Sequence, residues 1–189
     1  EYHIAIGRIA WVGDTFGITS ITGYGSAKFD RSGELDFSSV DFLREGFNYE
    51  RRKSFSQELR IQSVGDRKLN WIVGAVYARD KQKEGEFIAA GAQNDIDLPA
   101  GFPIELSHFD QTITSKSVFG ELTYDVTDRL SLTAGARYSH DKIKRFEDQI
   151  EFGGPLQNVA GSRSFSDVSP RFVVKYALTS ANADSINLF

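Results

Sequence analysis

Residues 130–139 read LSLTAGARYS, and apolar side chains alternate with small or polar ones along this stretch. The apolar set consists of Leu130, Leu132, Ala134, Ala136 and Tyr138. Successive side chains of a β-strand point to opposite faces of its sheet. The stretch therefore predicts a strand with one wholly apolar face and one small or polar face.

The stretch just before it, residues 117–126, reads SVFGELTYDV and alternates in the same way, with Phe119 as the exception. Only Thr127, Asp128 and Arg129 separate the two stretches. A short polar connection between two alternating runs is typical of a β-hairpin. We therefore predict an antiparallel hairpin over residues 117–139.

The hairpin pattern repeats along the chain. Residues 69–81, LNWIVGAVYARDK, align without a gap on residues 130–142, LSLTAGARYSHDK. A third copy is weaker, but it keeps the eight-residue spacing from Phe16 to Tyr24 that also separates Leu69 from Tyr77. The copies are unevenly spaced, which favours repeated hairpins with variable loops over a regular solenoid.

The repeat predicts an all-β fold, an antiparallel up-and-down meander of about eight long strands. We expect strands at 2–12, 15–28, 52–64, 68–81, 113–126, 129–144 and 166–178, and the start of another near 185. Short turns near 13–14, 65–67, 127–128 and 180–184 alternate with long connections at 29–51, 82–112 and 145–165.

Composition excludes several classes of protein. The chain of 189 residues carries 22 Lys and Arg against 26 Asp and Glu, and this mild negative charge argues against a nucleic-acid binder. It has no Cys, which excludes disulfides and thiolate chemistry. It also has no Met, which favours a piece of a longer protein. The longest stretch without a charged residue, 15–27, is too short for a transmembrane helix.

The length of the strands points to a membrane barrel. Eight steps from Leu69 to Tyr77 cover roughly 26 Å, or about 19 Å of height when the strand is tilted. Tyr24, Tyr77 and Tyr138 then lie at one rim, where we expect them to be lipid-interface aromatics. Short turns on one side and long loops on the other are the layout of outer-membrane barrels. A soluble sandwich with a solvated polar face is the alternative.

Four stretches resemble the barrel of TonB-dependent outer-membrane receptors. They are residues 54–63 with 69–77, residues 118–141, residues 165–171 and residues 18–24. The resemblance covers about residues 10–178 and implies a transmembrane barrel of 22 strands, plugged by an N-terminal domain on which TonB acts. We interpret residues 1–189 as a partial barrel domain without plug or closing strand, and residues 181–189 depart from the family pattern.

No pattern in the chain predicts a catalytic, cofactor or metal site. His3, His108 and His140 are far apart and stand in no ligand motif. Ser139, His140 and Asp141 are consecutive in a predicted strand, so they point to alternate faces and cannot assemble a triad. Residues 94–97, NDID, would suit a calcium ion, although a plain polar loop explains them better. Residues 23–25, GYG, lack the rest of a phosphate-binding fingerprint.

Charged side chains on the predicted strands suggest two further roles. The clusters Arg51-Arg52-Lys53 and Lys142, Lys144, Arg145 lie near the extracellular strand ends, where they form either a solvated rim or contacts with anionic headgroups or an anionic ligand. We predict that the barrel lumen is faced by Glu58, Arg60, Glu121, Thr123 and Arg137.

The chain is thus interpreted as part of a receptor in the bacterial outer membrane that is not an enzyme. By resemblance, it takes up scarce nutrients, commonly ferric siderophores, energised through TonB. Its expected partners are membrane lipids and lipopolysaccharide, the plug domain of the same protein, TonB and a small ligand, with no cofactor. A passive porin-like barrel and a soluble β-sheet domain for binding or adhesion are the alternatives. The transported substrate lies beyond what these residues specify.

Overall fold

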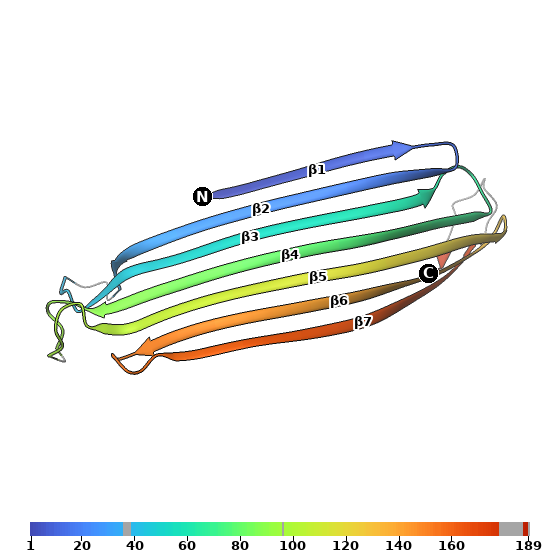
Figure 1. Cartoon of the computed structure of the whole chain (residues 1–189). Coiled ribbons are helices and arrows are strands. Elements are labelled where there is room, and N and C mark those ends of the chain that lie inside the picture. Colours follow the sequence, from blue (N-terminus) through green and yellow to red (C-terminus); the bar gives the residue numbers. More distant parts are fainter. Residues whose placement is uncertain (36–38, 96, 178–186, 189) are drawn as a thin grey trace.

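The computed structural model describes residues 1–35, 39–95, 97–177 and 187–188, and these residues form one antiparallel sheet (Figure 1). The strands run in chain order from β1 to β8, each pairing with the next. Their bounds are β1 Tyr2–Val12, β2 Phe16–Glu34, β3 Leu43–Ser63, β4 Leu69–Ala90, β5 Pro103–Thr127, β6 Leu130–Glu151, β7 Gln157–Ala177 and β8 Asn187–Leu188.

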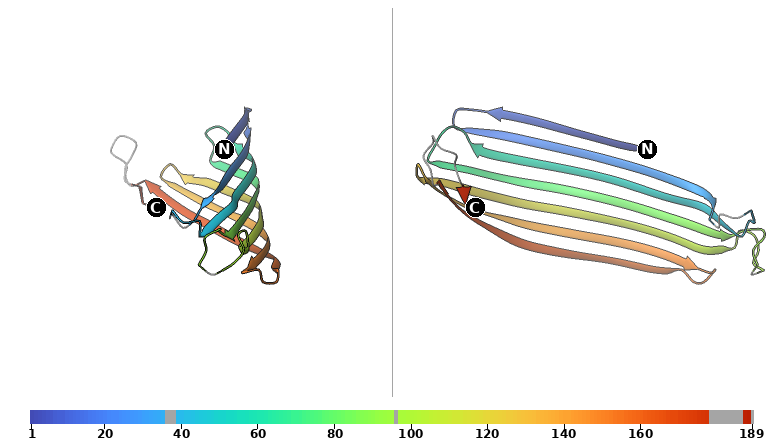
Figure 2. Two further views of the ribbon diagram at one scale, coloured as in Figure 1. Left: turned by 90° about the vertical axis from the view of Figure 1, so that its left-hand side faces the viewer. Right: turned by 180° about the vertical axis from the view of Figure 1, so that it is seen from behind.

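The predicted all-β meander is confirmed, with seven long strands and a two-residue eighth. The described residues contain no helix, and none of their segments could therefore cross a membrane as a helix. Within that described part, β1 pairs only with β2, so the sheet is open, as expected, and it twists along its length (Figure 2). Most of residues 181–189, whose placement the sequence did not specify, lie outside the described residues.

The strands are longer than the sequence predicted. β2 to β7 each span 19–25 residues, and much of the predicted long connections at 29–51, 82–112 and 145–165 is strand. The connections that remain on this side are 35–42, 91–102 and 152–156. The prediction was wrong because it followed apolar alternation, whereas the hydrogen-bonded ladder continues through segments in which polar side chains occur on both faces.

Pairing, rather than a buried core, holds this sheet together. Among the described residues, only Ala89 and Ala90 are buried hydrophobic residues. Large apolar side chains such as Ile9, Leu122 and Phe172 are exposed on the sheet. No second layer packs on either face of this single sheet, so both faces are accessible for contact with other molecules.

Phe119, the exception to the alternation, is accommodated by a glycine on the neighbouring strand. Phe119 is the direct cross-strand partner of Gly74, and a Cβ built on Gly74 would collide with the Phe119 ring. The Phe119 ring therefore packs over the Gly74 backbone, in the space that a larger side chain would occupy. Aromatic–glycine contacts of this kind help to fix the register of neighbouring strands. The exception to the pattern is thus a packing contact within the sheet.

Candidate functional site

The register of the sheet sorts the predicted side chains onto two faces. Direct cross-strand partners share a face, and pairs such as Leu59–Ala75, Trp71–Leu122 and Leu122–Ala134 connect the central strands. We call the face reached in this way the apolar face. It contains all nine residues predicted to share one face, so this prediction is confirmed: Leu59, Ile61, Trp71, Val73, Leu122, Tyr124, Leu132, Ala134 and Tyr138.

The opposite face, which we call the polar face, carries Glu58, Arg60, Glu121, Thr123 and Arg137. Their polar groups are paired along and across the strands. Arg60 forms an ion pair with Glu58, and Arg171 Nη1 lies 2.6 Å from Glu121 Oε2. The Thr123 and Thr133 hydroxyls are 2.9 Å apart, and Arg137 Nη2 donates to Ser117 Oγ at 2.9 Å. That this face lines a lumen stays a prediction.

The three tyrosines at the predicted rim lie on the apolar face, but not in one hydrogen-bonded row. Tyr24 is level with Arg79 through Phe55, and Tyr77 is level with His140 through Lys116. We call the line through Tyr24, Tyr77 and Tyr138 the tyrosine line. Relative to the rows of cross-strand partners, this line shifts by two residues toward the short turns for every two strands. With about 3.3 Å per residue and about 4.8 Å between strands, the strands tilt about 35° from the normal to this line. Such a tilt is typical of transmembrane barrels.

A second aromatic belt lies next to the short turns and was missed by the sequence analysis. It consists of side chains on the same apolar face: Trp11, Phe16, Trp71, Tyr124 and Tyr176. The signal was present, since each of these residues stands near the turn-side end of a strand. That these five side chains form one belt on one face became clear only from the cross-strand register of the sheet.

The surface between the two belts carries no Asp, Glu, Lys or Arg on the apolar face of the described strands. The belts are six to eight residues apart along a strand, roughly 16–22 Å of height after the tilt. This height is close to the apolar band of about 25 Å that outer-membrane barrels present to lipid. The polar face at the same height holds charged ion pairs, so only one face suits contact with lipid.

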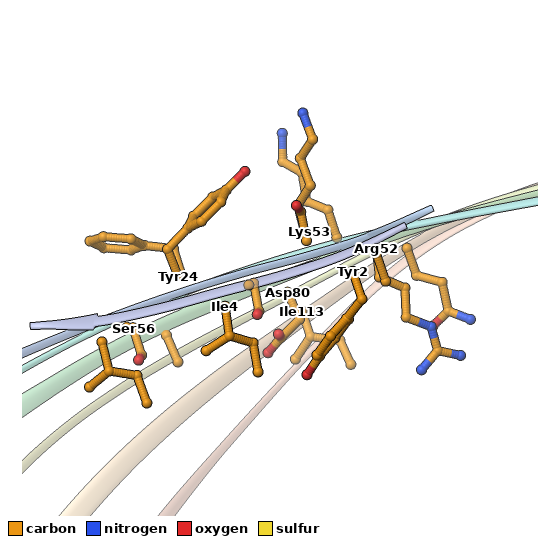
Figure 3. A pocket seen from close by; sticks show the side chains of 18 of the residues that line it. Tyr2, Ile4, Tyr24, Arg52, Lys53, Ser56, Asp80 and Ile113 are labelled. Atoms are coloured by element: carbon orange, nitrogen blue, oxygen red, sulfur yellow. The ribbon is translucent and has the colours of Figure 1, made fainter. Parts of the chain in front are cut away.

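Beyond the tyrosine line, the predicted basic clusters divide between the two faces. Lys53 pairs with Lys81 and lies on the apolar face with Tyr24, whereas Arg52 lies on the polar face. Figure 3 shows this split: the Tyr24 and Lys53 side chains point to one side of the sheet, and those of Arg52, Ser56 and Asp80 to the other. Lys144 and Arg145 likewise point to opposite faces.

The remaining candidates form no reactive group among the described residues. His108 and His140 each have a hydroxyl partner, with Nδ1 3.0 Å from Tyr49 Oη and 2.8 Å from Ser166 Oγ, respectively. The described residues contain no cluster of three His, Cys, Asp or Glu that could hold a metal ion. Of the loop considered for calcium, Ile96 lies outside the described residues. Asn94 is engaged with the loop backbone, where it donates to Leu98 O and accepts from Leu98 N.

Comparison with known proteins identifies the family. Residues 7–188 match the family model "TonB dependent receptor-like, beta-barrel". No curated protein matches the chain. Among solved structures, the ferric yersiniabactin uptake receptor FyuA from Yersinia pestis has a similar fold, with a TM-score of 0.73 at 21% sequence identity. The match covers 94% of this chain and 26% of that receptor. The chain belongs to the family of TonB-dependent receptor-like β-barrels.

Proposed function

We propose that residues 1–189 form part of the transmembrane barrel of a receptor in the bacterial outer membrane. The observation that carries this proposal is the band between the two aromatic belts, which is free of charge on one face only. Lipid is the solvent that such a face requires, because Arg or Lys at the bilayer midplane costs about 2–4 kcal/mol in a membrane barrel. In the complete protein we expect a barrel of 22 strands, of which this chain supplies about a third.

The polar face then borders the lumen. Glu58, Arg60, Glu121, Thr123 and Arg137 meet either the plug domain of the same protein or the path of the substrate. Their ion pairs and hydrogen bonds within the sheet support this assignment, since a polar interior is the rule in large barrels. Family membership supports a plug and TonB as partners.

We infer that the complete protein takes up scarce nutrients with energy delivered through TonB. Ferric siderophores are the class of substrate that we expect, because the similar fold of FyuA belongs to a ferric yersiniabactin uptake receptor. A passive porin-like barrel would have the same lipid-facing band but would not need energy. The two therefore differ in how uptake depends on the inner-membrane proton gradient.

The test uses the full-length receptor in cells that lack their own siderophore receptors. Uptake of iron-55 is measured for a panel of ferric siderophores, with and without a protonophore and in cells with and without TonB. We expect at least one complex to enter, and its uptake to fall to background when either TonB or the gradient is lost. Uptake that persists without both would identify a passive barrel, and recovery of the protein from the soluble fraction would identify a binding domain.

A further inference from the structure

We propose that the β2–β3 and β4–β5 connections are fastened into one rigid unit, which moves as a whole about a line of β-bulges. The unit comprises residues 39–45 and 89–95, and we call it the cap. The two segments are far apart in the sequence but lie together at the loop-side ends of β3 and β4 (Figure 1). The cap goes beyond the proposed function and is expected equally in a transporter and in a passive pore.

Backbone hydrogen bonds join the two segments beyond the end of the β3–β4 ladder. Gly91 N donates to Phe42 O at 2.8 Å, and Gln93 N donates to Asp41 O at 2.9 Å. The paired strands themselves end one residue earlier. These bonds therefore hold the two connections together where the strands no longer do so.

The Asp41 side chain fastens the same contact. Its Oδ2 accepts from Ala92 N at 3.1 Å and from Arg44 Nη2 at 2.6 Å. Asp41 N in turn donates to Gln93 Oε1 at 3.1 Å. The other carboxylate oxygen, Oδ1, is buried without a hydrogen-bond partner among the described residues, which costs solvation. Asp41 is therefore the positioning residue of the cap, since it bonds to the second segment through its N–H, its carbonyl and its carboxylate.

Close packing makes the cap a single body. It holds Ala89 and Ala90, the only buried hydrophobic residues among those described, and the buried side chain of Glu45. A Cβ built on Gly91 would lie 2.0 Å from Asp41 O, so the backbones of the two segments are in direct contact. Groups packed in this way shift together rather than past one another.

A line of irregular pairing crosses three neighbouring strands at the base of the cap. Gly46 is skipped in the pairing of β3 with both of its neighbours, and Ile104 is skipped in the pairing of β5 with β4. Glu45 pairs with Ile88, and Ile88 with Glu105, so these bulges lie at one level. Bulges interrupt the ladder and bend the strand. A rigid cap above such a line, with regular ladders below it, has the form of a hinged unit.

The fastening is tested by amide hydrogen exchange of the full-length receptor in lipid vesicles. Asp41→Ala changes the first segment only. We expect the amides of Ala92 and Gln93, in the second segment, to exchange about tenfold faster or more, since the Ala92 amide loses a hydrogen bond to a charged group. The matched control Arg44→Ala breaks only the exposed ion pair within the first segment and should change these rates by about twofold or less. Protected amides in β6 show that each variant is folded. Unchanged exchange in Asp41→Ala would overturn the fastening.

The hinge is tested by distances between pairs of spin labels on cysteines introduced at exposed positions. Ser39 and Asp95 lie on the two segments of the cap, and Lys81 lies on β4 below the bulges. We expect a narrow distribution of distances between positions 39 and 95 and a broader one between 39 and 81, because the cap swings as one body. Asp41→Ala should remove this difference by broadening the first distribution. Equal widths for the two pairs in the receptor that retains Asp41 would overturn the hinged cap.

Discussion

The two halves of each long strand follow different rules. In the half next to the short turns, represented by residues 118–126 of β5 and 130–138 of β6, one face is apolar and the other mostly polar. In the half next to the long connections, polar side chains occur on both faces: Thr112 and Lys144 lie on one face, and Gln111 and Arg145 on the other. The strand thus continues wherever backbone pairing continues, and under the proposed function the alternation of polarity marks the part of the strand that contacts lipid.

The largest expected effect comes from placing a charge on each face of the turn-side half. Leu132→Arg puts a cation into the charge-free band and should cost about 2–4 kcal/mol of stability in the membrane. Thr133→Arg changes the adjacent residue on the polar face and should cost much less. Guanidinium unfolding of the full-length receptor in lipid vesicles measures both. Equal losses for the two variants would mean that the faces do not differ in their surroundings.

Two glycines on opposite faces provide the next test. A Cβ on Gly74, on the polar face, would collide with the Phe119 ring and lie 2.9 Å from Leu59 O. On the apolar face, a Cβ on Gly120 would make only ordinary contacts, 3.6 Å from Val73 Cγ1. Gly74→Ala should therefore destabilise the barrel by about 1–3 kcal/mol. Gly120→Ala serves as its control and should have little effect in the same unfolding measurement.

In the loop-side half, we expect a smaller effect from the ion pair of Arg31 and Glu45. Arg31 Nη2 lies 2.7 Å from Glu45 Oε1, and the Arg31 guanidinium holds the pKa of the Glu45 carboxyl below its ordinary value. Both residues lie near the loop-side ends of β2 and β3, well outside the charge-free band that we propose to cross the membrane. Glu45→Gln should raise local opening of the β2–β3 tip by on the order of 1 kcal/mol or less, because Arg31 is half exposed.

The pH dependence of this effect has a defined sign. A carboxyl whose pKa is lowered by folding stabilises the fold above its unfolded pKa, and this contribution is lost as the pH falls through the folded pKa. Amide hydrogen exchange at residues 31–34 and 43–45 should therefore be faster in Glu45→Gln than in the unmodified receptor at neutral pH. The difference should vanish in acid. A difference that persists there would assign the effect to packing.

The smallest effect is expected at Glu105, which also lies at the loop-side end of its strand, outside the band that we propose to cross the membrane. Burial and the neighbouring Glu86 and Glu151 carboxylates raise the pKa of Glu105. A raised folded pKa means that the fold loses stability as the pH rises through the unfolded pKa and then the folded one. Glu105→Gln removes this loss and should be neutral or slightly stabilising at neutral pH, within about 0.5 kcal/mol. Thermal melting at neutral and mildly acidic pH measures the change.

The turn-side half of the strands could be predicted from the sequence, because apolar and polar residues alternate there. Leu132 and Thr133 alternate because their surroundings differ, so strand, register and face could be inferred there. Thr112 and Gln111 are both polar, so no alternation marked the loop-side half, and the strands were predicted to be too short. The tyrosine rim followed from repeat spacing. The turn-side aromatic belt and the tilt depend on cross-strand partners such as Trp71 and Leu122, which only the paired sheet defines.

The central claim, that lipid covers one face of the sheet, can be tested residue by residue. The chain has no Cys, so a cysteine introduced at each of positions 130–138 carries a spin label at a site that is unique within it. In the full-length receptor in lipid vesicles, we expect collision with oxygen, which concentrates in lipid, to peak at Leu132, Ala134 and Ala136. Collision with a water-soluble nickel chelate should be lowest at the same positions. Oxygen accessibility without a two-residue period, or with peaks at Ser131, Thr133 and Gly135, would contradict the account.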